Sequence, residues 1–305
     1  MKSIFHEGEL AVQAQAGVQE MASRVGKSIR SIIPLAAQEF LSSQPFAVLS
    51  SIDQQGRVWA SILTGQPGFI RTLDERTIQI QAMPAAGDPL AENILLNDQI
   101  GMIVIEFATR RRIRMNGTAK IDKEAIHIQT EQVYSNCPKY IQARTWKSQV
   151  ESNDQISVQR SAEFSYQQQS WIQQADTFFI ASHHKDGGAD ASHRGGNPGF
   201  IQILDRNTLR FPDYTGNTMF QTLGNISVNP NCGLLFIDFE RGATLQLTGT
   251  AKIVWDRNQL TEFRDAERAV EFRASEILEI IGAFPLRWEF GSYSPHNPVE
   301  NKKGR

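Results

Sequence analysis

The sequence is poor in cysteine and has no long apolar run, and both absences narrow the class of protein. Its 305 residues include only two cysteines, Cys137 and Cys232, too few for a disulfide-rich scaffold, and we expect both to be free thiols. No apolar run reaches the roughly 20 residues of a membrane-spanning helix. The first residues, MKSIFHEGELAVQAQ, lack the apolar core of a signal peptide. We therefore expect a cytoplasmic protein with no membrane partner.

An excess of charge of one sign is also missing. Lys and Arg number 31 against 33 Asp and Glu, which leaves a formal net charge of -2. That balance gives no electrostatic reason to expect nucleic acid as a partner. A hydrophobic fraction of 40% and a charged fraction of 21% are those of an ordinary globular protein, and the length suits two domains of about 150 residues each.

The chain contains an internal repeat. The pentapeptide GTAKI occurs at Gly117–Ile121 and again at Gly249–Ile253, an offset of 132 residues. At an offset of 131, Ser61–Thr77 matches the segment 192–208 at nine of 17 positions, and Asn93–Ile121 matches 225–253 at 11 of 29. Because the offset changes by only one, the two copies predict the same architecture. The polar stretch Lys147–Arg160 is the best linker, so we expect domains at 1–155 and 156–305.

Short segments rich in β-forming residues follow one another in the same order in both copies. Five or six antiparallel strands at close spacing in each copy predict a small barrel. The expected strands are 46–52, 57–64, 77–83, 100–107 and 110–119 in the first copy, and 177–182, 189–194, 208–212, 232–239 and 243–251 in the second.

Helical patterns flank both predicted barrels. We expect Ile32–Leu41 and Ala162–Gln174 to be helices that precede them, and Glu131–Trp146 and Gln259–Ile281 to be helices that follow them. The last segment has strongly amphipathic spacing. Within the third, Asn136 before Cys137 and Pro138 suits the start of a helix.

The second copy carries four longer motifs, DASHRGGNPGF (Asp190–Phe200), TLRFPDYTGN (Thr208–Asn217), NISVNP (Asn225–Pro230) and GLLFID (Gly233–Asp238). Together they resemble the pyridoxamine 5′-phosphate oxidase-like family of FMN-binding split β-barrels. Asn136–Lys139 is similar to the His-Cys-x-Lys segment of its single-domain members. The resemblance implies a mainly β, α+β fold of two tandem split β-barrels with flanking helices, which hold FMN non-covalently between them.

The phosphate of FMN needs convergent N–H groups and cations. Gly216 lets the backbone of the loop 214–218 approach closely, although this stretch also suits an ordinary turn. The basic run 110–114 has an uncharged counterpart, so it is either a solvated edge strand or the source of cations that this loop lacks. The residues expected to hold the cofactor are Ser192, Arg194, Asp213, Tyr214, Thr215, Gly216, Asn217 and Thr218 of the second copy, with Arg110, Arg112, Arg114 and Lys139 of the first.

A pseudo-twofold pair of barrels would create a second, equivalent site. It would join the loop Pro84–Pro89 to the strand Gly242–Gln246. There Asp88 would set a carboxylate against the phosphate, and no arginine would compensate. We therefore predict one FMN per chain.

The other candidate groups give a weaker signal. His183, His184 and His193 have no metal-ligand spacing and suit polar strand positions, although one could lie over the flavin. Cys137 has no base partner for nucleophilic chemistry, and Cys232 suits a core. No catalytic acid–base pair and no metal site is predicted.

The resemblance implies an FMN-dependent oxidoreductase of unknown substrate, with a small-molecule redox substrate or electron donor as its partner. A flavin carrier or sensor without enzymatic activity, and a family variant that binds haem or another ligand, stay open as alternatives. Activity on pyridoxamine phosphate is not expected, because Arg287–Arg305 does not match the family's substrate segment. We expect a homodimer, although a functional monomer is possible.

Overall fold

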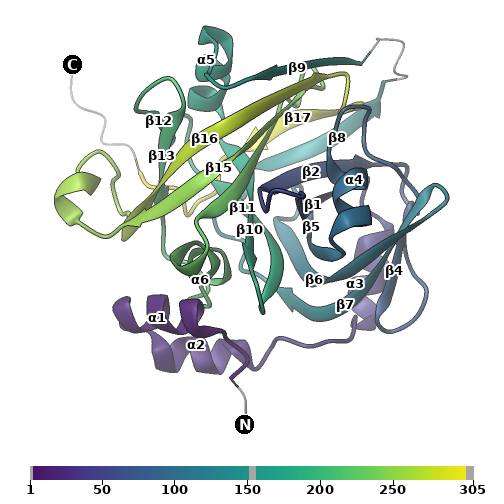
Figure 1. Ribbon diagram of the computed structural model, residues 1–305, viewed down its shortest axis with the longest axis horizontal. Helices are drawn as coiled ribbons and strands as arrows, with labels where there is room; N and C mark the ends of the chain where they lie inside the picture. The colour runs from purple at the N-terminus through teal and green to yellow at the C-terminus, as the bar shows by residue number, and fades with distance from the viewer. Residues whose placement is uncertain (1–2, 151–155, 300–305) are drawn as a thin grey trace.

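Two sheets with the same strand order make up most of the computed structural model, which describes residues 3–150 and 156–299. The order is β2-β1-β5-β6-β7-β4-β3 in the first repeat and β11-β10-β14-β15-β16-β13-β12 in the second, with antiparallel pairing throughout. Each strand of one sheet thus has its counterpart in the other (Figure 1). The expected tandem split-barrel fold is confirmed.

The strands of the first repeat are β1 Phe46–Ile52, β2 Val58–Thr64, β3 Ile70–Thr72, β4 Thr77–Ile80, β5 Gln99–Glu106, β6 Arg111–Asp122 and β7 Ala125–Ser135. Those of the second are β10 Thr177–His184, β11 Gly188–Gly195, β12 Gln202–Ile203, β13 Thr208–Asp213, β14 Asn231–Ile237, β15 Thr244–Val254 and β16 Arg268–Ile281. Strands β8 (Ala143–Gln149) and β17 (Leu286–Ser292) form a separate two-stranded sheet, and β9 (Ser157–Ser161) pairs with β16.

The GTAKI pentapeptide is repeated because both copies need its glycine at a β-bulge. The register shifts between Asn116 and Gly117 in β6, and between Thr248 and Gly249 in β15. A Cβ at either glycine would lie 2.0 Å from a carbonyl oxygen of the neighbouring strand. No side chain fits at that distance, so the bulge fixes the residue type.

The two barrels pack face to face through a shared apolar core. Residues from β1, β2 and β5 lie against residues from β10, β11 and β14, including Phe46, Ile103, Phe179 and Leu235. Gly101 of β5 and Gly233 of β14 occupy equivalent positions in this interface, and a Cβ on either would collide with the backbone of the opposite repeat. These glycines allow the close backbone approach that brings the ends of β6 and β11 together.

Two predicted helices are wrong. The segment 131–146 contains the end of β7, a loop and the start of β8, and Asn136 begins no helix. The segment 259–281 contains the end of a short 3₁₀ helix, Arg257–Leu260, and then β16. The buried side chains of β16 alternate with a period of two, and the bulge interrupts this alternation. The resulting spacing of apolar residues resembles that of a helix. Pairing with β15 decides the outcome.

The linker expected at 147–160 is partly structured, since it includes the end of β8 and most of β9. The boundary expected between residues 155 and 156 falls at the edge of 151–155, which lies outside the described residues.

Helices cover the ends of the barrels, and the sequence patterns found two of them, α3 (Leu35–Ser42) and α5 (Tyr166–Gln174). The sequence patterns did not predict α4 (Leu90–Leu96) and α6 (Gln221–Val228), which occupy equivalent places in the two repeats. They also did not predict α1 (Glu7–Gln15) and α2 (Gln19–Gly26). In the described part of the chain, no helix is long and apolar enough to cross a membrane.

The N-terminal helix α1 packs on α6 of the second repeat (Figure 1). Gly8 and Gly224 allow this close approach, since a Cβ on Gly8 would lie 2.2 Å from the Gly224 oxygen. Gln13 donates to the Met219 carbonyl at 3.0 Å. Glu9 is buried beside this contact and accepts a hydrogen bond from the His6 amide at 2.8 Å. Burial raises the pKa of the Glu9 carboxyl to about 8.

Replacing Glu9 with Gln should make the protein more stable in mildly alkaline solution. The folded state holds the Glu9 proton up to about pH 8, whereas the unfolded chain releases it near pH 4.5, the ordinary pKa of a glutamate. The wild type therefore loses stability as pH rises between these values, by about 1.4 kcal/mol per pKa unit at most. Urea unfolding should show Glu9→Gln close to wild type at pH 5 and more stable at pH 8.5. Equal stability at pH 8.5 would refute the buried acid, and Glu20→Gln on exposed α2 is the control.

Candidate functional site

A polar cleft lies where β6 of the first repeat meets β11, β13 and the start of α6 in the second. Its volume is about 780 Å³ when the open mouth is counted, and about 100 Å³ when only the space that admits a water molecule is counted. Ten of the 12 predicted cofactor residues line it: Arg112, Arg114, Lys139, Ser192, Arg194, Asp213, Tyr214, Gly216, Asn217 and Thr218. Thr215 and Arg110 do not line it. Residues 100 positions apart in the chain thus meet as the repeat argument expected.

The basic run 110–114 is not an edge strand, because β6 pairs with β5 on one side and β7 on the other. Its side chains alternate in direction. Arg112 and Arg114 face the second repeat, where they contact His193 and Asp190. Arg111 pairs instead with Glu106 of its own repeat at 2.9 Å. Arg110 donates to the Ile141 carbonyl at 3.0 Å and to the Ser292 hydroxyl at 2.8 Å.

Arg112 is a cation without a carboxylate. Its Nη1 lies 3.0 Å from Nδ1 of His193, and its Nη2 donates to the Cys137 carbonyl at 2.9 Å. Its Nε is buried and has no partner. Burial, with further repulsion from Arg114 and Arg194, lowers the pKa of Arg112 to about 10. Arg112 therefore stays charged at neutral pH and lacks a counter-ion.

Arg114 is held by a buried carboxylate. It pairs with Asp190, which also accepts from the Tyr134 hydroxyl at 3.2 Å and from the Thr222 hydroxyl at 3.0 Å. The Arg114 guanidinium lies over the Tyr134 ring, 5.1 Å from its centroid. Burial raises the pKa of Tyr134, so its hydroxyl stays protonated and keeps donating. This network ties both repeats together below the cleft.

Arg194 and Asp213 have a different arrangement from the one predicted. Arg194 pairs with Asp213, and the same carboxylate lies 3.1 Å from Nε of Arg268. Arg268 is buried and also pairs with Glu267. The charge of Arg194 is therefore compensated inside the protein, and Asp213 holds arginines. Arg268 comes from β16. The sequence patterns did not identify it because that segment was predicted to be a helix.

The loop 214–220 contains backbone strain at two residues that are not glycine. Gly216 does not adopt a positive φ, whereas Thr218 and Phe220 have φ of 64° and 61°. Left-handed conformations at such residues cost of order 1 kcal/mol or more and often occur at functional sites. Asn217 holds the loop by accepting from the Met219 amide at 3.1 Å, and Thr215 donates to Glu267 at 2.9 Å.

Two further side chains at the cleft carry unused donors. His193 was not among the predicted cofactor residues, yet it is 4% exposed and its Nε2 has no partner. Burial and the neighbouring arginines hold its pKa well below the usual range, so the ring is neutral. Since Arg112 faces Nδ1, the proton lies on Nε2. Lys139 lines the cleft with no ion-pair partner among the described residues.

The pseudo-symmetric counterpart of this cleft is filled. Trp59 occupies the position of Asp190, and Gln246 that of Arg114. Trp59 packs with Leu278 and Ile280 of the second repeat. Asp88 was expected to set its carboxylate against a phosphate in this second site. It instead accepts hydrogen bonds from Ser61 at 2.7 Å and from Gln246 at 2.8 Å. Burial raises the pKa of Asp88 to about 6.

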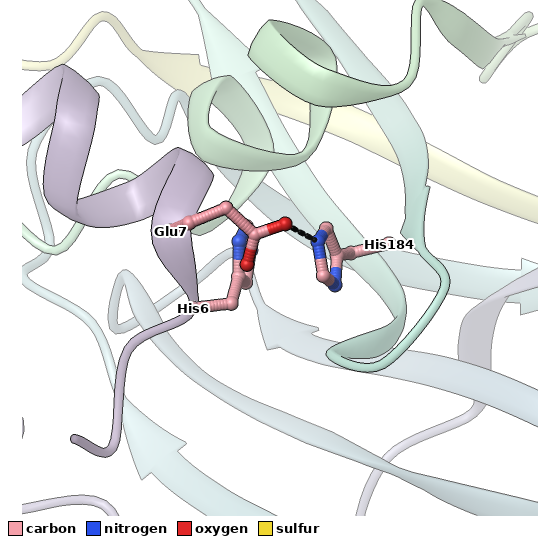
Figure 2. Close-up of side chains that lie close together, drawn as sticks. All are labelled: His6, Glu7 and His184. Atoms are coloured by element: carbon pink, nitrogen blue, oxygen red, sulfur yellow. Dashed lines mark hydrogen bonds and ion pairs between the residues drawn. The ribbon is translucent and has the colours of Figure 1, made fainter. Parts of the chain in front are cut away.

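Outside the cleft, His6, Glu7 and His184 form the side-chain cluster that Figure 2 shows. His184 lies 3.0 Å from the Glu7 carboxylate, and His6 lies 2.9 Å from the Asn225 side-chain oxygen. The imidazole rings are stacked, with centroids 3.8 Å apart and planes 12° from parallel. A metal ion binds a ring nitrogen near the ring plane at about 2.0–2.1 Å, and these two planes do not converge on one point. The cluster fastens α1 to the second repeat.

Asp190→Ala should destabilise the protein strongly. The change leaves Arg114 buried without a counter-ion and removes the acceptor of Tyr134 and Thr222. Breaking a buried pair in this way costs about 3–5 kcal/mol, measurable by urea unfolding at pH 7. The control is Glu106→Ala, which breaks the exposed pair with Arg111 and should cost about 1 kcal/mol or less. Equal costs for the two variants would refute the structural role of Asp190.

Solved structures of other proteins, including the following three, are similar to part of the chain. HupZ from Group A Streptococcus has 16% identity over 36% of this chain and 90% of its own, with a TM-score of 0.30. A Lactobacillus delbrueckii protein, provisionally described as a pyridoxamine 5′-phosphate oxidase, has 19% identity over 38% and 94%, with a TM-score of 0.32. An FAD-binding protein from Mycobacterium smegmatis has 16% identity over 40% and 98%, with a TM-score of 0.29.

No curated protein is similar enough to this chain to count as a match. The model of the pyridoxamine 5′-phosphate oxidase family, whose members generally bind flavin, matches the chain twice, at residues 33–152 and 164–281. Together these segments span well over half of the chain and coincide with the two repeats. The chain belongs to the pyridoxamine 5′-phosphate oxidase family and is a tandem-duplicated member of it.

Proposed function

We propose that the cleft between β6 and β11 binds FMN and that the protein is an FMN-dependent oxidoreductase. The observation that carries this proposal is a concentration of unused donors. Arg112, Arg114 and Arg194 each have a buried Nε without a partner, and Nε2 of His193 is in the same state. All four line one cleft. An unsatisfied buried donor costs about 1–3 kcal/mol, so a ligand rich in acceptor oxygens would recover that energy.

Charge favours an anion as this ligand. Asp190 and Asp213 neutralise Arg114 and Arg194, while Arg112 and Lys139 have no carboxylate partner among the described residues. A phosphate dianion offers both the missing charge and several acceptors.

Bound FMN would supply hydride or electron transfer, and the protein would hold and orient it. The proposed reaction partner is a small-molecule redox substrate or electron donor, and we do not propose a particular compound. His193 would offer a neutral N–H donor, because its depressed pKa keeps the ring uncharged near pH 7. Arg112 would pair with the phosphate. A flavin carrier or sensor would need the same site, so turnover decides between it and an enzyme.

The purified protein should bind one FMN per chain, with a yellow colour that dithionite bleaches, and should prefer FMN to riboflavin. Arg112→Ala should weaken FMN binding tenfold to a hundredfold, since a charged hydrogen bond contributes about 1.5–3 kcal/mol. Asn217→Asp should also weaken it, because the carboxylate still accepts from Met219 but repels the phosphate. Flavin fluorescence titration gives the affinities.

The matched control is Asp88→Asn in the filled counterpart site, which should leave FMN affinity unchanged. Equal affinity for riboflavin and FMN, or two equivalents of FMN per chain, would contradict the assigned site. Steady-state oxidation of reduced nicotinamide by the FMN-loaded protein tests the enzyme. No turnover with any of several electron donors would favour the carrier.

We also propose that assembly does not change this stoichiometry. Both repeats of the same chain contribute residues to the cleft, so intrachain pairing would take the place of a second chain. Light scattering combined with flavin absorbance should give one FMN per chain whether the protein is a dimer or a monomer. Loss of flavin from a monomeric fraction would show that a second chain contributes to the site.

A further inference from the structure

A second, wider groove lies on the first repeat, directly beside the cleft. It is bounded by the segment 28–40, the turn before β6 and the loop after β7. Its volume wide enough for water is about 680 Å³, within the roughly 300–1,000 Å³ of small-molecule sites. Arg112 and Asn136 line both the groove and the cleft. A molecule in the groove would therefore lie next to the proposed flavin.

The groove carries positive charge that the protein does not neutralise. Four arginines line it, and no Asp or Glu is among its lining residues. Only Arg111 has a carboxylate partner, Glu106. Arg110 donates to carbonyl and hydroxyl oxygens, and Arg112 contacts a neutral imidazole and a carbonyl. Arg30 is exposed, and no side-chain partner for it occurs among the described residues.

The rest of the wall is apolar. Phe40, Ile113 and Val133 are buried and line the groove together with one proline and two alanines of the 28–40 segment and with Pro138. The guanidinium of Arg111 lies 5.2 Å from the centroid of the Phe40 ring. Such a wall packs against a flat apolar body, while the arginines bind an attached anionic group through paired hydrogen bonds.

We propose that this groove binds a small organic anion with an aromatic or otherwise flat apolar body, beside the proposed flavin site. The position beside a flavin rests on the proposed function, whereas the binding does not. An apolar wall alone would accept neutral molecules equally well. The arginines without carboxylates make the preference for an anion, since each unpaired cation near the surface gains from an opposite charge.

Calorimetric titration with 8-anilinonaphthalene-1-sulfonate, an aromatic anion, tests the binding. It should bind at one saturable site, at least tenfold more tightly than its uncharged analogue N-phenyl-1-naphthylamine. The double variant Arg30→Gln/Arg110→Gln, which removes two arginines without a carboxylate partner, should weaken binding of the anion about tenfold and leave binding of the neutral analogue unchanged. Arg76→Gln, an exposed arginine outside the groove, is the control and should have no effect.

Equal binding of the two probes, or an equal loss in Arg76→Gln, would overturn the anion site. Urea midpoints of all variants should match the wild type, which separates a binding effect from unfolding. The same titration of FMN-loaded protein should perturb the flavin absorption band, because the two sites share Arg112. An anion site in a protein that fails to bind FMN would support the groove and contradict the proposed function. An unchanged spectrum of bound FMN at a saturating concentration of the anion would contradict the contact between the two sites.

Discussion

Close packing between the two barrels is the constraint on which the rest of the structure depends. Gly101 brings β5 against the backbone at Asp190, and Gly233 brings β14 against the backbone at Trp59. A side chain at either glycine would force the barrels apart. Only at this separation can Arg112 and Arg114 of one repeat reach His193 and Asp190 of the other. The candidate site is therefore a product of the interface.

The duplication provides two equivalent positions for a site, and the chain uses them differently. On one side Arg114, Asp190 and Tyr134 form a polar network beneath an open cleft. On the other side, Gln246 takes the place of Arg114 and Trp59 takes the place of Asp190. Trp59 packs with apolar residues of β16. Apolar packing on this second side strengthens the pairing of the barrels. The interface thus has an open polar cleft on one side and a packed side on the other.

The cleft and the groove share a wall at Arg112, and both contain arginines without a carboxylate partner. Two buried carboxylates hold the arginines nearest the interface, and Arg112 at the shared wall has none. Arg30 and Arg110 extend this uncompensated charge along the groove. Arg112 is buried without a counter-ion, which is costly, and this supports the proposal that the cleft takes an anionic ligand.

The sequence by itself determined the duplication and most strand positions. These depend on local alternation and on self-similarity, both of which are visible along the chain. The candidate cofactor residues came from the resemblance to the family, and ten of them line one cleft. The tertiary structure alone decided that the segment 268–281 is a strand, because pairing with β15 outweighs its helical spacing. It alone decided that Asp213 binds Arg194 and Arg268, that His193 is buried and neutral, and that Asp88 turns inward. Each of these outcomes depends on contacts between residues distant in the sequence, for which no local pattern carries a signal.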